Sequence, residues 1–89
     1  MNINTVKDLK QALRNGPYAW PGGYPLYFIT SDGSALSFKA VRENLRSVLW
    51  SIKNKVSDGW RVQAMAINYE DNGLYCDHTG EKIESAYGE

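Results

Sequence analysis

The sequence predicts an α+β fold, in which two helices cover one face of a small antiparallel sheet of three to five strands. Two segments carry apolar residues at the three- and four-residue spacing of a helix, and others are rich in aromatic and β-branched residues. Turns that contain glycine separate these segments. With 89 residues, 43% of them hydrophobic, residues 1–89 are expected to form a single domain.

The first helix is expected over residues 6–14, because Thr5 and Asp8 have the spacing of a capping box and Asn15-Gly16-Pro17 is a stop signal. The second and longer helix is expected over residues 38–54, with Ser37 as its N-cap. Its apolar residues form one stripe that should be buried: Phe38, Val41, Leu45, Val48, Leu49 and Ile52.

Residues 15–25 hold all three prolines and three of the eight glycines, so we expect neither a helix nor a central strand there. The segment also carries Tyr18, Trp20 and Tyr24, and we call it the aromatic loop. Aromatic residues on a stiffened loop indicate either a lid packed on the core or a contact surface. The sequence leaves both alternatives open.

Strands are expected at residues 26–30, briefly at 35–36, and at 60–69, with a bulge near 64–66 where the apolar alternation changes face. Residues 74–76 and 82–83 are expected to form a closing hairpin. Asp32-Gly33, Asp58-Gly59 and Asn72-Gly73 mark turns between these elements.

The net charge of zero conceals a separation of charge along the chain. Residues 1–63 hold nine of the ten Lys and Arg and four of the ten acids, so they carry +5 and residues 64–89 carry −5. Two interpretations remain open. Either the acidic end packs beside the basic helices, or one pole of the molecule meets a partner.

One face of the long helix joins an aromatic residue to four cations. On a helical wheel Trp50 lies about 150° from the centre of the buried stripe. We name this face the basic ridge, and it comprises Lys39, Arg42, Arg46, Trp50 and Lys53. Either Trp50 is covered by another element and the cations are solvated, or the ridge is a contact surface, since Trp and Arg are enriched in binding hot spots.

Metal and catalytic chemistry find little support in the sequence. Cys76-Asp77-His78-Thr79-Gly80 has the shape of a zinc knuckle, but Thr79 replaces the second thiolate, and this segment holds the one Cys and the one His of the chain. No residue that would orient a Cys76–His78 pair can be identified. We therefore expect no metal, no cofactor and no enzymatic activity.

The sequence also bears on location. No apolar run has the length of a membrane span, and residues 1–5 lack the features of a secretory signal. We expect a cytoplasmic protein that does not enter the membrane. Nothing in the sequence specifies its oligomeric state.

Several stretches together resemble short uncharacterised proteins encoded by bacteriophages and plasmids. They are GPYAWPGGYP (16–25), SDG (31–33), LSFK (36–39), DGWRV (58–62) and IESAY (83–87). The resemblance implies a protein of a mobile element, a setting in which small proteins often bind and inhibit host machinery, CRISPR effectors included. It implies no catalytic residues.

The expected function is therefore that of a non-enzymatic binding protein, which contacts a protein of the host or of a rival element through the aromatic loop and the basic ridge. The alternative is a small nucleic-acid-binding module that uses the same ridge, with cations along phosphates and the Trp50 indole stacked on a base.

Overall fold

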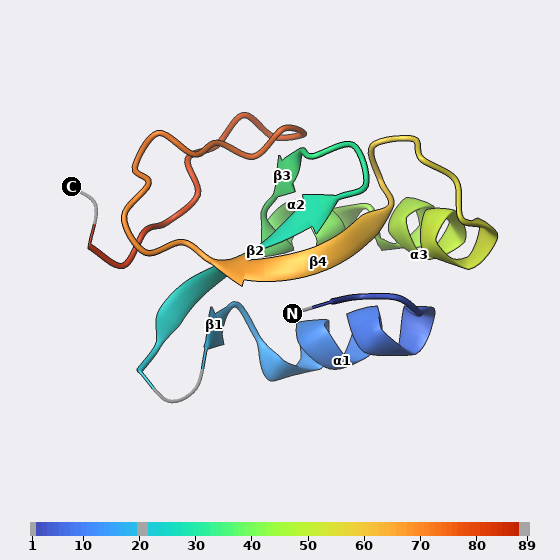
Figure 1. The fold of residues 1–89 in the computed structure, drawn as a ribbon, viewed down its shortest axis with the longest axis horizontal. Helices are drawn as coiled ribbons and strands as arrows, with labels where there is room; N and C mark the ends of the chain where they lie inside the picture. Colours follow the sequence, from blue (N-terminus) through green and yellow to red (C-terminus); the bar gives the residue numbers. More distant parts are fainter. Residues whose placement is uncertain (1, 20–21, 88–89) are drawn as a thin grey trace.

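Residues 2–19 and 22–87 are described by the computed structural model of the chain. Its three helices and its four-stranded antiparallel sheet confirm the predicted α+β fold (Figure 1). In chain order the elements are α1 (Val6–Asn15), β1 (Tyr18–Ala19), β2 (Tyr24–Thr30), β3 (Ala35–Leu36), α2 (Phe38–Glu43), α3 (Leu45–Asn54) and β4 (Val62–Ile67). Strand β2 pairs with each of the other three strands.

Helix α1 begins at the predicted capping box. The Asp8 amide donates to Thr5 Oγ1 over 3.1 Å, and the Thr5 amide donates to Asp8 Oδ2 over 3.2 Å. The helix ends at Gly16, whose φ of 92° is readily adopted by glycine. These signals lie within a few residues of each other, so the sequence was sufficient to predict both ends of the helix.

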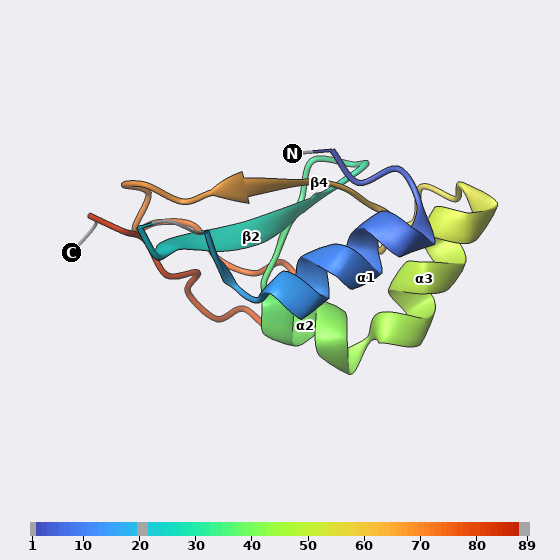
Figure 2. The ribbon, with the colours of Figure 1, turned by 90° about the horizontal axis from the view of Figure 1, so that it is seen from below.

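The continuous helix expected over residues 38–54 is instead two helices, α2 and α3, separated at Asn44. Asn44 has φ −119° and ψ 31°, and its side-chain amide donates to the Ala40 carbonyl over 3.0 Å. An Asn side chain that bonds a nearby carbonyl competes with regular helix geometry. Figure 2 shows that α2 and α3 consequently run in different directions.

The aromatic loop does contribute to the central strand, so that part of the expectation is wrong. Strand β2 begins at Tyr24 and includes Pro25, which pairs with Tyr18 of β1. The Pro25 carbonyl accepts from the Asn68 amide over 2.9 Å. The Asn68 carbonyl, for which Pro25 has no donor, accepts from the Ala86 amide over 2.9 Å. The C-terminal segment thus supplies the hydrogen bond that proline lacks.

Strand β4 is shorter than the predicted strand and carries its irregularity one residue earlier. Ile29 pairs with Ala64 and Thr30 pairs with Val62, so Gln63 is the extra residue on β4. The Gln63 carbonyl accepts from the Ile3 amide over 2.9 Å, which holds the N-terminal segment beside β4. The register shift therefore also fixes the start of the chain.

The predicted closing hairpin is present in the C-terminal segment as a bridge between Tyr75 and Lys82. The Cys76 amide donates to the Glu81 carbonyl and the Ile83 amide donates to the Leu74 carbonyl, over 2.8 Å each. This hairpin runs beside β3, as Figure 1 shows, and the Asp77 amide donates to the Ala35 carbonyl over 2.9 Å.

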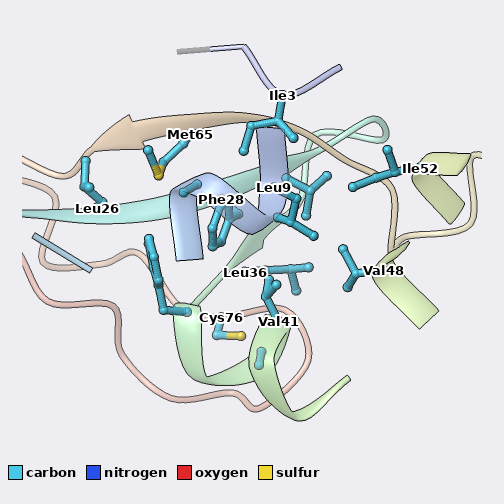
Figure 3. Packing of buried hydrophobic residues seen from close by; sticks show 14 of the residues in the cluster. Ile3, Leu9, Leu26, Phe28, Leu36, Val41, Val48, Ile52, Met65 and Cys76 are labelled. Atoms are coloured by element: carbon cyan, nitrogen blue, oxygen red, sulfur yellow. The ribbon is translucent and has the colours of Figure 1, made fainter. Parts of the chain in front are cut away.

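The core lies between the sheet and the three helices, which all lie on the same side of the β2–β4 pair (Figure 2). Phe28 of β2 and Phe38 of α2 meet in its centre with ring centroids 4.4 Å apart. Figure 3 shows side chains from the helices, the sheet and the C-terminal hairpin converging on this centre. The predicted stripe supplies the helical half, with Phe38, Val41, Val48 and Ile52 buried and Leu45 and Leu49 half-buried.

Candidate protein-binding surface

A groove beside α3 brings together two tryptophans, and we call it the tryptophan groove. Trp50 projects from α3 and is 56% exposed, while Trp60 precedes β4 and is half-buried. The groove has a volume of about 250 Å³. It is lined by Arg46, Ser47, Trp50, Asp58 and Trp60. The sequence left open whether another element covers Trp50, and in the structure the Trp50 side chain is exposed.

The segment that carries Trp60 is fixed to α3 by a buried polar contact. Ser51 is fully buried, and its hydroxyl lies 2.8 Å from each carboxylate oxygen of Asp58. The Trp60 amide donates to Asp58 Oδ1 over 3.1 Å. Arg61 adds a bond from its guanidinium to the Lys55 carbonyl over 3.2 Å. Both walls of the groove are therefore held before any partner arrives.

A second hollow adjoins the tryptophan groove, and we call it the Trp60–His78 hollow. Its volume is about 190 Å³, and Asp58 and Trp60 line both spaces. The rings of Trp60 and His78 meet edge to face, with centroids 4.7 Å apart and an interplanar angle of 60°. The lining residues are Leu36, Asp58, Gly59, Trp60, Asp77 and His78.

The break at Asn44 separates the two halves of the basic ridge. On α2, Lys39 pairs with Glu81 over 3.3 Å, an exposed contact that contributes little stability. Arg42 donates to the Leu13 carbonyl over 3.1 Å and lies 5.7 Å from the centroid of the Phe38 ring. On α3, Arg46 and Trp50 line the tryptophan groove, and Lys53 is exposed in the last turn.

The described part of the aromatic loop is tied to the C-terminal segment. The Tyr18 hydroxyl donates to Glu84 over 2.7 Å, and this bond raises the pKa of Tyr18. Tyr24 packs against Tyr69 and Tyr87, with ring centroids 5.5 and 6.1 Å away. Of the three aromatic residues that the sequence singled out in this loop, Trp20 lies outside the described residues.

We call Tyr24, Tyr69 and Tyr87 the tyrosine cluster. The Tyr87 hydroxyl donates to the Tyr24 hydroxyl over 3.1 Å, and the pKa of Tyr87 is raised by this contact. Tyr69 and Tyr87 remain 51% and 62% exposed. The loop is thus an anchor for the end of the chain that leaves aromatic surface open to solvent.

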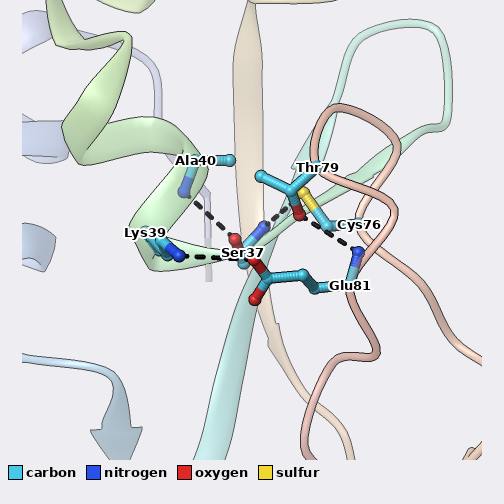
Figure 4. A network of polar contacts seen from close by, with 6 residues as sticks. All are labelled: Ser37, Lys39, Ala40, Cys76, Thr79 and Glu81. Carbon is cyan, nitrogen blue, oxygen red and sulfur yellow. Dashed lines mark hydrogen bonds and ion pairs between the residues drawn. The ribbon is translucent and has the colours of Figure 1, made fainter.

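Cys76 and His78 point to different neighbours. Cys76 is buried and its sulfur accepts from the Ser37 amide over 3.4 Å (Figure 4), whereas the His78 ring meets the Trp60 ring edge to face. Burial raises the pKa of the Cys76 thiol, but hydrogen bonds from Thr79 and Ser37 outweigh it and lower the pKa to about 7. Among residues 2–19 and 22–87, no three His, Cys, Asp or Glu side chains are grouped to hold a metal ion.

The sequence analysis did not single out Trp60, Tyr69 or Tyr87 as site residues, and it weighed His78 as a metal-binding or catalytic residue beside Cys76 and not as part of a binding surface. Trp60 and His78 lie in different loops. Tyr69 follows β4, and Tyr87 lies near the end of the chain. The sequence did offer one indication of these residues, since each of Trp60, His78 and Tyr69 is an aromatic residue in or beside a predicted turn. Their meeting depends on the tertiary pairing of distant segments.

Comparison with known proteins gave no relative from which a function could be taken. No protein-family model matches the chain, and no curated protein or solved structure matches it. Within the described residues no helix has the length and apolar character needed to cross a membrane.

Proposed function

We propose that this chain is a non-enzymatic protein-binding domain and that it contacts its partner through the tryptophan groove. The observation that carries the proposal is Trp50, a tryptophan that is 56% exposed at the rim of a groove beside Arg46. Tryptophan and arginine are the residue types most enriched at the energetic centres of interfaces. An apolar side chain from a partner would fit between the Trp50 and Trp60 indoles.

The rigidity of the groove supports the same function. The Ser51–Asp58 contact and the Trp60 amide bond fix the loop against α3. A preformed surface loses little conformational entropy on binding, so more of the contact energy appears as affinity. The exposed rings of the tyrosine cluster provide a further aromatic surface at the far end of β2.

The partner that we propose is a protein of the host bacterium or of a rival mobile element, and a CRISPR effector is one such partner. This part of the proposal comes from the resemblance to phage and plasmid proteins. Binding at the groove would modulate or inhibit that protein by occupying its surface, which needs no reaction.

The test compares two exposed aromatic residues. Trp50→Ala should weaken partner binding by about 2 kcal/mol or more, roughly 30-fold, because it removes one wall of the groove. Tyr75, which is 55% exposed and does not line the groove, provides the matched control Tyr75→Ala. Binding is measured by affinity capture from host lysate followed by calorimetry with the purified partner.

The stability of both variants is measured by urea denaturation. Each should lower the free energy of unfolding by less than about 1 kcal/mol, since each side chain is more than half exposed. A Trp50→Ala protein that is folded and binds the partner as tightly as the Tyr75→Ala control would contradict the proposal.

A second candidate function is nucleic-acid binding, and the observation that favours it lies on α1. Lys7, Lys10 and Arg14 share one helix face, and none of them is in an ion pair within the described part of the chain. Binding of single-stranded DNA or RNA that weakens steeply with salt would favour this function. The expected fall in the association constant is about 0.7 logarithmic units per phosphate contact for each tenfold increase in salt concentration. Binding that is insensitive to salt would favour the protein partner.

A further inference from the structure

We propose that the Trp60–His78 hollow receives an arginine side chain of the partner protein. This inference rests on the proposed function, because it names the chemistry that the partner presents beside the tryptophan groove. Asp58 and Trp60 line both spaces, so one segment of a partner can occupy both at once.

The aromatic wall of the hollow suits a cation. A guanidinium over the face of an indole is attracted by the negative potential of the ring, and tryptophan gives the strongest interaction of this kind. The Trp60 ring is half-buried and is held by the edge-to-face contact with His78 at 4.7 Å. A side chain that enters the hollow therefore meets an indole whose orientation is already fixed.

Two carboxylates from separate loops complete the hollow. Asp58 precedes β4, and Asp77 lies in the turn of the C-terminal hairpin. A third carboxylate, that of Asp32, lies beside Gly59, 3.7 Å from the position of a Cβ at that glycine. The ion pair found among residues 2–19 and 22–87 joins Lys39 to Glu81, so none of these three carboxylates forms an ion pair within the described chain. Their charge is available to a partner.

The geometry of the carboxylates favours a guanidinium over a metal ion. Asp58 is oriented by Ser51 and by the Trp60 amide, which leaves it further lone pairs to accept from a ligand. The described residues hold no cluster of three metal-ligating side chains. Arginine can stack on an indole and donate two parallel hydrogen bonds to a carboxylate, which lysine cannot do.

Charge also sets the direction in which the partner segment lies. Arg46 lines the tryptophan groove and not the Trp60–His78 hollow, so it repels a second cation from the groove. An arginine of the partner is thereby directed to the Asp77 side. The apolar residue that accompanies it lies between Trp50 and Trp60.

The test titrates N-acetyl-arginine amide into the isotopically labelled protein and follows the backbone and indole N–H signals by nuclear magnetic resonance. We expect saturable shifts at the Trp60 indole and at His78, with a dissociation constant on the order of 10 mM for so small a ligand. N-acetyl-citrulline amide has the same shape without the charge, and it should produce no saturable shift. N-acetyl-lysine amide should bind at least about threefold more weakly than the arginine compound.

Asp77→Asn should weaken binding of the arginine compound at least about fivefold. Glu70→Gln removes an exposed carboxylate outside the hollow and should leave binding unchanged. Because Asp77 and Glu70 are both exposed, neither substitution should disturb the fold. Comparison of each variant's spectrum with that of the wild type checks that the fold is intact. Equal shifts with citrulline, equal binding of lysine, or an Asp77→Asn protein that binds like the wild type would each overturn the inference.

The outcome is separable from that of the proposed function. The titration needs no partner protein, and the Trp50→Ala comparison needs no arginine compound. If Trp50→Ala abolishes partner binding while the arginine compound does not bind, the proposal of a partner site at the tryptophan groove is supported and that of an arginine site in the Trp60–His78 hollow is wrong. If the arginine compound binds and Trp50→Ala leaves partner binding intact, the proposal that the partner binds at the tryptophan groove is wrong and that of an arginine site in the Trp60–His78 hollow is supported.

Discussion

Cys76 illustrates how neighbours decide the chemistry of a single side chain. Burial alone would keep its thiol protonated, but the Thr79 hydroxyl and backbone and the Ser37 amide all bond to the sulfur. The pKa therefore falls from its ordinary value of 9.0 to about 7. The same Thr79 hydroxyl accepts from the Glu81 amide over 3.2 Å, which places it beside the sulfur (Figure 4).

Thr79→Val is expected to raise the pKa of Cys76 above about 7, because the hydroxyl donor is lost while burial and the backbone bonds from Ser37 and Thr79 remain. Titration of thiolate ultraviolet absorbance measures the change, and Thr79→Ser, which keeps a hydroxyl, is the control. An unchanged titration midpoint in Thr79→Val would show that the hydroxyl does not set the pKa.

The same shift has a consequence for stability. Since the folded thiol loses its proton at a lower pH than the unfolded one, the wild-type protein gains stability as the pH rises from about 7 to 9.0. This gain should be reduced in Thr79→Val. Urea denaturation at both ends of that pH range measures it.

The contact between α3 and the loop that follows it shows how two elements are joined into one surface. Ser51 lies on the buried side of α3, and Asp58 lies on the exposed loop, seven residues later in the chain. One hydroxyl thus connects the helix that carries Trp50 to the segment that carries Trp60. The tryptophan groove exists because these two elements are held together.

Ser51→Ala is expected to lower the free energy of unfolding by about 1–3 kcal/mol, because a hydrogen bond to a charged group is lost in a buried setting. The indole N–H signal of Trp60 should also shift, since its loop loses the anchor. Ser47→Ala, on the exposed side of the same helix, should change stability by less than about 0.5 kcal/mol. Equal effects of the two substitutions would show that the Ser51–Asp58 contact does not hold the loop.

The C-terminal segment closes the molecule by binding the end of the sheet. Asn68 is 3% exposed, and its side-chain amide donates to the carbonyls of Asp71 and Glu84 over 2.9 and 3.1 Å. Its backbone carbonyl accepts from Ala86, and the Tyr69 carbonyl accepts from Tyr87. These bonds bring Tyr87 to Tyr24 and so assemble the tyrosine cluster from three distant parts of the chain.

Asn68→Ala is expected to lower the free energy of unfolding by about 2–3 kcal/mol, because the carbonyls of Asp71, Ile83 and Glu84 lose the donor that the buried Asn68 side chain supplies. Hydrogen exchange should become faster at the Ala86 and Tyr87 amides before it does so in α1. Gln11→Ala, which removes an exposed amide bonded to Asn15, is the control and should have little effect. Unchanged exchange at Ala86 and Tyr87 would mean that Asn68 does not retain the segment.

The parts of this protein that could be predicted from its sequence are those fixed by neighbours along the chain. The capping box at Thr5 and Asp8, the glycine at the end of α1 and the buried stripe of α2 and α3 each depend on residues within one or two helical turns. The same periodicity predicts that Trp50 lies away from the buried stripe, and the tertiary structure decides that no other element covers it, because Trp50 is 56% exposed. Local geometry leaves few alternatives at such positions, so the pattern and the structure agree.

The remainder depends on contacts between residues that are far apart in the chain. Pro25 can belong to a central strand because Ala86 supplies the missing donor, and Trp60 meets His78 because the C-terminal hairpin runs beside β3. The basic ridge is divided because Asn44 turns its side chain to the Ala40 carbonyl and α3 takes a new direction. Pairings of this kind are chosen by the free energy of the assembled core and by the satisfaction of its buried hydrogen bonds, and no single segment carries that information.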